Sequence, residues 1–504
     1  MSSQQENTPV TQGKPDTING RPHRLKTGAE YKDSLKDNRQ IWVGGRKLAS
    51  VYDEPALAKG IDTLASMFDD QFDPEYQDAT TYYDDRIGAV ISRAWQVPRS
   101  KEDLAARRRM IEYTSLKTAG TFGRPPDLSP AIVAGLYAYL PTFRQKKSMI
   151  DGIDPDFGAN IEAYMEYGQN NNLTASESLA GPQADRSSPK ASEASMLKVK
   201  KVTKDGVYIY GAKTVGSIAA QANDIFFTNL GGLMETPPEA CIWGSVPIDT
   251  DGIKMISREM VSQPEASKFD HPVSSLGEEA DQFIVFDNVF VPKERLFNLG
   301  DPTGMSWYGP VCVYAHWHVL SRLAVKAELF VGAGQMVLDY LGTGKIPAVQ
   351  MMLGQLIEYA QTLRAFVTAA EALAVELEGG VVRPDVGMLT AGRLYSIENY
   401  PKIIHILQEM CGQGLVMRFG KNAFDNPDVG HFLHELLPGH GVSAMVKEQL
   451  MNFIWDMTSG SLAGRVALFE NVNATPAPAL RARLYNEVKR DAYVAQVKKI
   501  AGIE

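Results

Sequence analysis

A short polar segment in the first half of the chain carries side chains suited to ligand binding. Gln183, Asp185, Arg186 and Ser187 offer an amide, a carboxylate, a guanidinium and a hydroxyl within five residues. Residues 173–188 are too polar for a core strand and too rich in Gly, Pro and Ser for a helix, so we expect a long loop. This loop could bind a polar ligand, or it could be a solvated linker between two domains.

Two histidines, His316 and His318, flank Trp317 at the point where a strand-rich region gives way to helices. An unperturbed imidazole has a pKa of about 6.5, so either histidine could act as a general base near neutral pH. Polar packing at a domain interface is the alternative interpretation of both residues.

Three further residues could bind anions or polar groups. Arg124 stands between a glycine and two prolines in GRPPD, so its backbone is stiff and its planar guanidinium would be presented rigidly to an anion. Arg465 and Asn473, in GRVALFENVN, permit a similar interpretation. For each of the three, the alternative is a polar residue at a surface turn.

Several common signatures do not occur in the sequence. No GxGxxG follows a predicted strand and no GxxxxGK[ST] is found, so the chain has no nicotinamide or nucleoside-triphosphate fingerprint. The segment HFLHELL does not match the HExxH spacing of metalloproteases, and the three cysteines are far apart. We therefore predict neither a metal site nor a disulfide framework.

Composition and charge narrow the class of protein further. The 504 residues suffice for about three domains, and the hydrophobic fraction of 44% is ordinary for a globular protein. A net charge of −9 argues against a surface that binds nucleic acid. The N-terminus has no apolar core of a signal peptide, and no apolar run reaches the roughly 18 residues of a membrane span. We expect a cytoplasmic protein that is not bound to a membrane.

The pattern of apolar residues divides the chain into four regions. Residues 1–24 are expected to be a disordered tail, and 25–172 a mainly helical N-terminal domain. Residues 173–300 should form a small antiparallel β domain that includes the polar loop. Residues 301–504 should form a helical bundle that also provides an oligomer interface.

Local signals place individual caps and turns within these regions. Thr27 is predicted to cap a short helix, and Ser129 is predicted to cap another helix ahead of Pro130. The segment IWVGGRKL is predicted to form a hairpin that turns at Gly44 and Gly45.

Eight segments, in order and with comparable gaps, resemble the 4-hydroxyphenylacetate 3-hydroxylase family. This family comprises the oxygenase components of two-component monooxygenases that use reduced flavin, including the chlorophenol monooxygenases. The segments are RLKTGAEYKDSLKDNRQIWVGG from residue 24, FDPEYQD at 72–78, GRPPD at 123–127, PQADRS at 182–187, GAKTVGS at 211–217, FDNVFVPKERLF at 286–297, HWHVLSR at 316–322 and GRVALFENVN at 464–473.

The resemblance implies an α+β fold similar to that of acyl-CoA dehydrogenases. Its parts would be an N-terminal helical domain, a middle antiparallel β-barrel and a C-terminal four-helix bundle, assembled as a homotetramer. It also implies a set of FAD contacts, which are Gln183, Arg186, Ser187, Ser217, Arg465 and Asn473.

The resemblance further implies catalytic roles near an aromatic substrate. Arg124 is expected at the active site, and His316 rather than His318 is expected to be a base or a hydrogen-bond partner of the substrate hydroxyl. This chain departs from the phenylacetate hydroxylases that it resembles at two positions. Those enzymes have a tyrosine and a histidine near the substrate, where this chain has Leu128 and Glu177. A different aromatic substrate is therefore expected, because the carboxylate of Glu177 would repel an acidic substrate, or could bind an amine or take a proton from a heteroatom.

The expected reaction is hydroxylation of a phenolic or related aromatic compound with O2 through a C4a-hydroperoxide of reduced FAD. Because the chain has no nicotinamide fingerprint, the reduced FAD should come from a separate NAD(P)H:flavin reductase. Oxygenation of nitrogen or of a heteroaromatic ring by the same fold is one alternative. The others are a flavoprotein like 4-hydroxybutyryl-CoA dehydratase, which would need clustered cysteine ligands for an iron–sulfur cluster, and a flavin-binding oligomer without catalysis.

Overall fold

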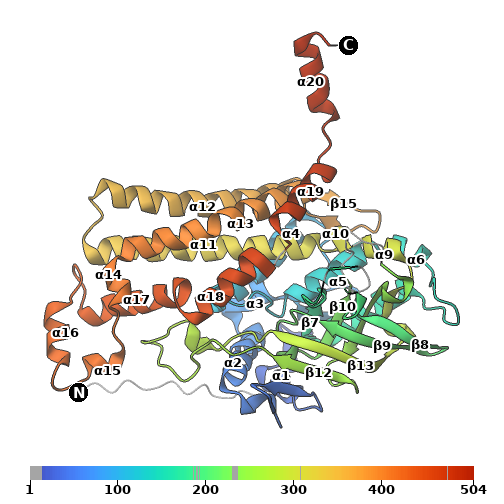
Figure 1. Ribbon diagram of the computed structural model, residues 1–504, viewed down its shortest axis with the longest axis horizontal. Coiled ribbons are helices and arrows are strands. Elements are labelled where there is room, and N and C mark those ends of the chain that lie inside the picture. The colour runs from blue at the N-terminus through green and yellow to red at the C-terminus, as the bar shows by residue number, and fades with distance from the viewer. Residues whose placement is uncertain are drawn as a thin grey trace.

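The computed structural model describes residues 14–185, 187–188, 191, 193–229, 236–306, 308–473 and 475–503. Three long helices lie along one side of the molecule, two β-sheets lie beside them, and the N-terminal helices pack against both (Figure 1). The described residues thus follow the predicted α+β order of helical, β and helical parts. No helix in the described part of the chain is both long enough and apolar enough to cross a membrane.

The N-terminal part is mainly helical, as predicted. Thr27 caps the first helix through a capping box with Glu30, which confirms the predicted cap. The elements are β1 (Thr17–Ile18), β2 (Arg21–Pro22), α1 (Gly28–Asp33), α2 (Pro55–Asp69), α3 (Pro74–Thr80), β5 (Thr81–Asp84), β6 (Ala89–Ser92), α4 (Lys101–Lys117), α5 (Leu128–Ala138), α6 (Leu140–Gln145) and α7 (Phe157–Asn171).

Two local expectations in this part differ from the structure. Where a disordered tail was expected, β1 and β2 pair with each other, because Ile18 packs with Leu25 and Val90 in a small buried cluster; residues 1–13 lie outside the described residues. Ser129 does not cap α5 but lies inside it, and Asp127 occupies the cap position. The hydroxyl of Ser129 is instead used in a tertiary contact described below.

The strands of the middle part pair as two sheets, and the pairing among the described residues forms no closed ring. Most neighbours are antiparallel, but β7 pairs parallel with β10, and β3 pairs parallel with β12. The four-stranded sheet has the order β14 (Leu296–Leu299), β11 (Ile242–Pro247), β10 (Asp224–Thr228) and β7 (Ala175–Ser178). The six-stranded sheet has the order β4 (Arg46–Lys47), β3 (Ile41–Val43), β12 (Ile253–Ser257), β13 (Gln282–Pro292), β9 (Gly206–Lys213) and β8 (Lys198–Thr203).

The predicted hairpin at Gly44 and Gly45 is present as β3 and β4, and it extends the six-stranded sheet. Aromatic packing joins the two sheets, since the rings of Phe227 on β10 and Phe286 on β13 meet edge to face at 5.3 Å. The core of the β part is therefore continuous between the sheets.

The polar segment after Leu173 was expected to be a loop, but its first residues form the buried strand β7. The hydroxyl of Ser176 donates to the carbonyl of Ser217, and Glu177 accepts a hydrogen bond from Ser129. Polar side chains can occupy a buried strand when each finds such a partner. The expectation was wrong here because these partners lie far away in the sequence.

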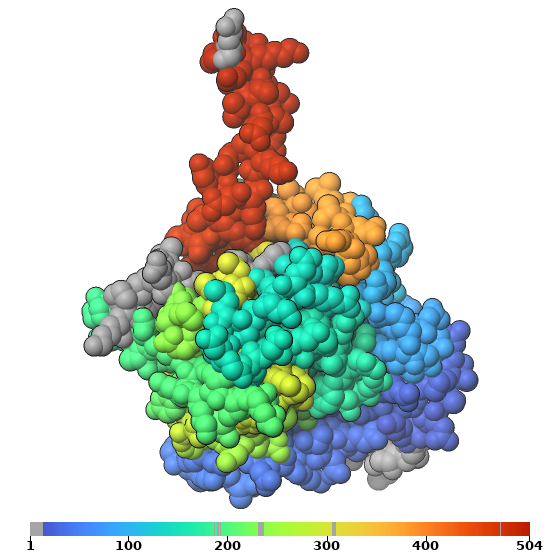
Figure 2. All heavy atoms as spheres, turned by 90° about the vertical axis from the view of Figure 1, so that its right-hand side faces the viewer, coloured from blue at the N-terminus to red at the C-terminus, as the bar shows by residue number. Residues whose placement is uncertain are grey.

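The C-terminal part is helical, and its three longest helices pack against one another. Its elements are α9 (Pro302–Ser306), α10 (Tyr308–Val311), α11 (Val313–Leu341), α12 (Pro347–Ala372), β15 (Val375–Glu376), β16 (Val382–Arg383), α13 (Val386–Cys411), α14 (Gln413–Val416), α15 (Lys421–Phe424), α16 (Gly430–Leu436), α17 (Ala444–Thr458), α18 (Ser461–Leu468), a π-helical turn (Phe469–Asn473), α19 (Ala477–Glu487) and α20 (Asp491–Ala501). The last helix, α20, stands clear of the rest of the molecule (Figures 1 and 2).

Helix α5 approaches the backbone that leads into α11 so closely that only glycine fits at one position. A Cβ atom added at Gly135 would lie 2.0 Å from the carbonyl oxygen of Val311. We predict that Gly135→Ala lowers the free energy of unfolding by about 3 kcal/mol, because the helix or the facing backbone must move. Urea denaturation followed by circular dichroism measures this change.

A glycine in open space provides the matched control. Gly354 on α12 has nothing within 4 Å of an added Cβ, so Gly354→Ala should raise stability by up to about 1 kcal/mol through helix propensity alone. Equal effects of the two substitutions would contradict the close packing at Gly135.

Candidate active site

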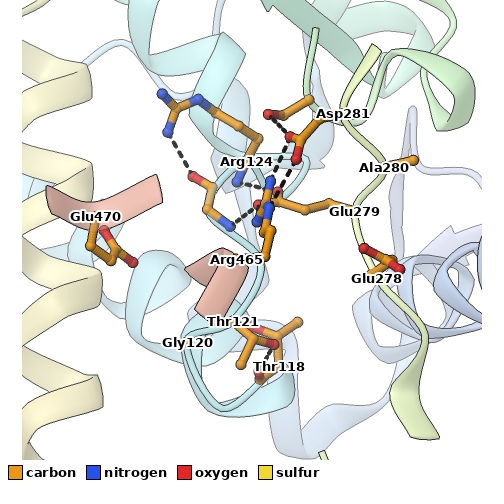
Figure 3. Close-up of polar contacts among 12 residues, drawn as sticks. Thr118, Gly120, Thr121, Arg124, Glu278, Glu279, Ala280, Asp281, Arg465 and Glu470 are labelled. Carbon is orange, nitrogen blue, oxygen red and sulfur yellow. Dashed lines mark hydrogen bonds and ion pairs between the residues drawn. The ribbon is translucent and has the colours of Figure 1, made fainter. Parts of the chain in front are cut away.

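Two acidic residues just before β13 join three distant parts of the chain. Arg465 of α18 donates from Nη1 to Glu279 at 2.7 Å and from Nε to Asp281 at 2.9 Å. Glu279 also accepts hydrogen bonds from the backbone N–H groups of Gly123 and Arg124, each at 2.6 Å. Figure 3 shows Arg465 between the two carboxylates, while the guanidinium of Arg124 extends away from them.

Asp281 is the most heavily bonded member of this cluster. Its carboxylate accepts the hydroxyl of Ser217 at 2.6 Å and Nε of Arg258 at 2.7 Å, besides Arg465. Burial alone would raise the pKa of Asp281, but Arg465 and Arg258 lower it to about 2. The structure thus brings the predicted flavin residues Ser217 and Arg465 onto one carboxylate.

Both arginines of the site contact one aromatic ring. The guanidinium carbons of Arg124 and Arg465 lie 4.7 and 4.4 Å from the centroid of Phe469. A Cβ atom at Gly123 would lie 2.2 Å from this ring, so the turn can approach Phe469 only with glycine at that position. Phe469 starts the π-helical turn after α18, a type of element that often occurs at functional sites.

Arg124 already has an anionic partner in the protein. Its Nε forms an ion pair with Glu177 of β7, and the Ser129 hydroxyl donates to the other carboxylate oxygen at 2.8 Å. Burial raises the pKa of Glu177, and this effect outweighs the opposing influence of Arg124. Glu177, the residue that departs from the phenylacetate hydroxylases, therefore lies in the site and offsets the charge of Arg124.

The two candidate histidines have different surroundings. His318 is fully buried, and its Nε2 lies 2.9 Å from Asp127 of the GRPPD segment, so it links α11 to that turn. His316 is partly buried, and its Nδ1 lies 3.4 Å from Nη1 of Arg483 on α19. Burial, together with the positive charges of Arg483, Arg393 and Arg124, lowers the pKa of His316 well below its usual value. His316 is thus held neutral beside the site.

The remaining predicted flavin contacts are at the surface or outside the described residues. The side chains of Gln183, Ser187 and Asn473 are exposed, and Arg186 is not among the described residues. The strand end at Thr214 bonds to the backbone just before Gln183, which places that loop near the segment of Ser217. Asn473 ends the π-helical turn that begins at Phe469.

Two models of one family match nearly the whole chain. The model described as 4-hydroxyphenylacetate 3-hydroxylase N terminal matches residues 27–298, and the model of its C terminal matches residues 304–502. The chain belongs to the 4-hydroxyphenylacetate 3-hydroxylase family. The resemblance seen in the sequence is thereby confirmed.

Two relatives of this family member match most of the chain. The oxygenase component of 4-nitrophenol 4-monooxygenase/4-nitrocatechol 2-monooxygenase from Rhodococcus opacus is 30% identical over 456 residues, which are 90% of this chain and 86% of that protein. The 2,4,6-trichlorophenol monooxygenase from Cupriavidus pinatubonensis is 28% identical over 489 residues, with coverages of 95% and 93%.

Solved structures show the same fold. The oxygenase component of 4-hydroxyphenylacetate 3-monooxygenase complexed with FAD is 27% identical, with a TM-score of 0.87 over 94% of this chain and 98% of that chain. A 4-hydroxybutyryl-CoA dehydratase from N. maritimus has a TM-score of 0.84 at 18% identity, covering 95% of each chain, and this likeness concerns the fold alone. The cysteines of the present family member, Cys241, Cys312 and Cys411, are all buried and form no disulfide.

Four charged residues at the candidate site are not marked by any motif in the sequence. Glu279 and Asp281 belong to the acidic run EEAD at 278–281, and that run between two strands was the one available signal. Arg393 and Arg483 approach His316 from α13 and α19. No local pattern marks these two arginines, because only helix packing brings them to His316.

The donor set of the site fits a flavin. Gln183 and Asn473 offer exposed amides, which suit the carbonyl, ring-nitrogen and phosphate acceptors of FAD. The Ser217 hydroxyl and the Arg465 guanidinium lie in the same region but are bonded to Asp281 and Glu279. In the described part of the chain, no group of three or more His, Cys, Asp and Glu residues is placed to hold a metal ion.

We predict that Asp281→Asn weakens the fold in a pH-dependent way. The pKa of Asp281 is about 2 in the folded protein against a reference of 3.8, so its charge contributes about 2 kcal/mol of stability. Because the folded-state pKa is the lower one, this contribution is complete above pH 4 and disappears as the pH falls toward 2. Urea titrations of both proteins at pH 7 and at lower pH values measure the difference.

Asp287→Asn serves as the control, since Asp287 pairs with Lys254 and both side chains are substantially exposed. Its effect should stay below about 1 kcal/mol at every pH. A loss for Asp281→Asn that is equally large at pH 2.5 and pH 7 would show that shape, and not charge, is responsible.

Proposed function

We propose that this chain is the oxygenase component of a two-component, flavin-dependent monooxygenase that uses reduced FAD and O2 to hydroxylate a phenolic or related aromatic compound. One observation in this chain, which matches the family models over both halves, carries the proposal. Three separate segments meet at the carboxylates of Glu279 and Asp281, and they contribute Arg124, Ser217 and Arg465. The FAD-bound relative supports reduced FAD as the cofactor.

The partners follow from the same assignment. The chain has no nicotinamide fingerprint of its own, so a separate NAD(P)H:flavin reductase supplies the reduced FAD. The relatives named as oxygenase components support this division of labour. We assign the enzyme to the cytoplasm, where such a reductase would be available.

Reduced FAD, when bound, supplies the activation of dioxygen that no amino-acid side chain can provide. The cofactor would be held by Ser217, Arg465, Gln183, Asn473, Arg186 and Ser187. The protein must also keep water away from the reacting atoms and hold the aromatic ring in a fixed orientation. Phe469, which contacts both Arg124 and Arg465, is a candidate wall for that ring.

His316 and Arg124 would act on the substrate oxygen. In the neutral imidazole, Nδ1 accepts from Arg483, so Nε2 carries the hydrogen. This arrangement favours His316 as a hydrogen-bond donor to a phenolate over His316 as the base. Arg124, held by Glu177, adds positive charge near the same oxygen, and a stabilised phenolate pushes electron density into the ring that is hydroxylated.

The substrate is an aromatic compound other than 4-hydroxyphenylacetate. The tyrosine and histidine expected for that compound are replaced by Leu128 and Glu177. In addition, Glu177 forms an ion pair with Arg124. Relatives named for 4-nitrophenol and 2,4,6-trichlorophenol support a phenolic substrate. Oxidation of nitrogen or of a heteroaromatic ring is the alternative, because Glu177 places a carboxylate in the site that could take the proton.

Turnover with a panel of aromatic compounds tests this function. Purified protein would receive reduced FAD, oxygen and a series of phenols, aromatic amines and heteroaromatic compounds, and products would be identified by mass spectrometry. Hydroxylated product from a phenol is the expected result, whereas product from amines alone would favour the alternative. Oxidation of the flavin without product from any member would contradict the proposal.

We predict that the kind of side chain at position 316 decides activity. His316→Gln keeps an N–H donor near the position of Nε2, so kcat should fall by no more than about tenfold. His316→Leu removes the donor and should cost about 100-fold, the value of a hydrogen bond to a charged oxygen. The rate of hydroxylation of each variant, measured by stopped flow, distinguishes the effect of His316→Gln from that of His316→Leu.

The control is His318→Gln, which alters the buried contact with Asp127. This substitution should lower the melting temperature but change the rate of hydroxylation little. If Gln and Leu at position 316 abolish activity equally, then His316 is a base, as the sequence interpretation also allowed.

We further propose that the enzyme is a homotetramer. Helix α20 carries apolar side chains with no cover in the described residues, since Tyr493, Val497 and Ile500 are 60, 62 and 87% exposed. An uncovered apolar stripe on a projecting helix is typical of a surface that packs against another chain. A second copy of this chain is the partner that the proposal requires.

We predict that removal of residues 489–504 weakens the assembly, because α20 is lost while Arg483 on α19 remains. Analytical ultracentrifugation should show an assembly with fewer copies of the chain than the full-length protein forms. The circular dichroism per residue should be unchanged once the loss of one helix is allowed for. Gln496→Ala, on the same helix, should leave the mass unchanged. A truncated protein that forms an assembly with the same number of copies as the full-length protein would contradict a role of α20 in assembly.

A further inference from the structure

Lys213, the last residue of β9, is a fully buried lysine without an acidic partner among the described residues. Its Nζ donates to the backbone carbonyl of Leu179 at 3.1 Å and to the side-chain Oδ1 of Asn229 at 2.5 Å. Lysine is almost never buried in this way unless it is paired with a charge. The contact between Lys213 and Leu179 therefore calls for an explanation.

The surroundings of Lys213 suit a neutral amine. Burial lowers the pKa of Lys213 to about 7, and no charged side chain among the described residues offsets this effect. A neutral amine has two N–H groups, which match the two oxygen acceptors, whereas an ammonium would bring a third donor and an unbalanced charge into the interior. Near neutral pH, Lys213 can thus donate two hydrogen bonds without the full cost of a buried charge.

Asn229 holds the amine in a fixed place. It directly follows β10 and is itself buried, and its Nδ2 donates to the carbonyls of Leu197 at 2.8 Å and Ala240 at 2.7 Å. Because both amide hydrogens are used, the Oδ1 atom faces Lys213. The carbonyl of Leu179 is therefore bonded to an amine whose position is set by the neighbouring strands.

The carbonyl of Leu179 lies at the base of the loop that carries Gln183. The next two carbonyls of this loop accept from the backbone N–H and the hydroxyl of Thr214 at 3.0 and 3.3 Å. The hydroxyl contact lies at the surface, where water can replace it. The amine of Lys213 is shielded from water, so its loss would leave buried oxygens unpaired. Of these contacts, the one from Lys213 is the hardest to replace.

The segment that begins at Lys213 also leads to the second group of flavin candidates. Ser217 follows in this segment, and its carbonyl accepts from the hydroxyl of Ser176 on β7 at 2.8 Å. β7 is thus tied to the segment twice, through Ser176 and through Leu179 just after the strand ends. A displacement at Lys213 would change the spacing between the loop and Ser217.

We propose that Lys213 is a positioning residue for the flavin, which it does not touch itself. By holding the carbonyl of Leu179, its amine fixes the loop that carries Gln183. The inference rests on the proposed function and adds to it a residue that places the cofactor contacts. A loop that is already in its bound conformation binds a ligand more tightly, because less conformational entropy is lost on binding.

Flavin binding to two variants tests this role. Lys213→Met keeps the length of the side chain but removes both donors, so the Kd for oxidised FAD, and for reduced FAD without oxygen, should rise about 10-fold. Lys213→Gln keeps two N–H donors one atom short of their place and should cause a smaller rise. The Gln variant still tests the proposal if the Met variant does not fold. Wild-type affinity in either variant would overturn the proposal.

Two controls separate positioning from loss of charge and from loss of stability. Lys200→Met removes an exposed lysine from the neighbouring strand β8 and should change the Kd by less than about twofold. Val207→Ala removes buried methyl groups near the start of β9, so it should lower the melting temperature but not the affinity for FAD. An equal loss of affinity in Val207→Ala and Lys213→Met at matched melting temperatures would overturn a specific role of Lys213.

Turnover at saturating reduced FAD distinguishes positioning from catalysis. Hydroxylation by Lys213→Met should then proceed within about threefold of the wild-type rate, because the flavin contacts themselves are intact. A much larger loss at saturation would overturn the assignment as a positioning residue. Absence of FAD binding by the wild-type protein would contradict the proposed function as well, whereas normal binding by Lys213→Met would overturn this inference alone.

Thermal melting without flavin tests the burial of the amine. The pKa of Lys213 is about 7 in the folded protein against a reference of 10.5. Because the folded-state pKa is the lower one, the cost of burying the charge is complete below pH 7 and disappears as the pH rises toward 10.5. The melting temperature of the wild type should therefore rise between pH 7 and pH 9 relative to that of Lys213→Met. Parallel curves for the two proteins would overturn the proposal.

Discussion

Arg465 lies between Glu279 and Asp281 in the interior, and this arrangement connects the N-terminal turn, the β part and the C-terminal helices. Charges taken out of water are tolerated only when each is paired and hydrogen-bonded, and here the guanidinium fork meets two carboxylates. Glu279 uses its oxygens on the backbone of Gly123 and Arg124 as well. Loss of any one partner would leave the others buried and uncompensated, so the position of Arg124 depends on a residue more than 300 positions later in the chain.

Much of the architecture could be predicted from the sequence, because it follows from local periodicity. The apolar spacing of α2 and α11, the capping box at Thr27 and the glycines of the β3–β4 hairpin are all short-range signals, and the structure contains each of them. β7 could not be recognised in this way. Its serines and Glu177 are buried because hydroxyl and carbonyl partners arrive from elsewhere in the fold.

The site shows the same division between local and distant information. Motif resemblance located Arg124, Ser217 and Arg465, and the structure brings them together. It did not reveal what each one binds: the partners Glu279 and Asp281 come from a separate segment. Distinguishing His316 from His318 required the surroundings of each ring, since one faces Asp127 and the other faces Arg483. Burial and electrostatics of this kind are properties of packing and are absent from a motif.

The parallel pairing of β3 with β12 has a consequence for how the protein is made. Ile41 pairs with Met255, so the N-terminal hairpin leaves the ribosome about 200 residues before its neighbour strand exists. Until then the edge of β3 presents unpaired backbone groups, and its side chains lack the sheet that later covers them. The six-stranded sheet can therefore be completed only after β12 has been synthesised, in the second half of translation.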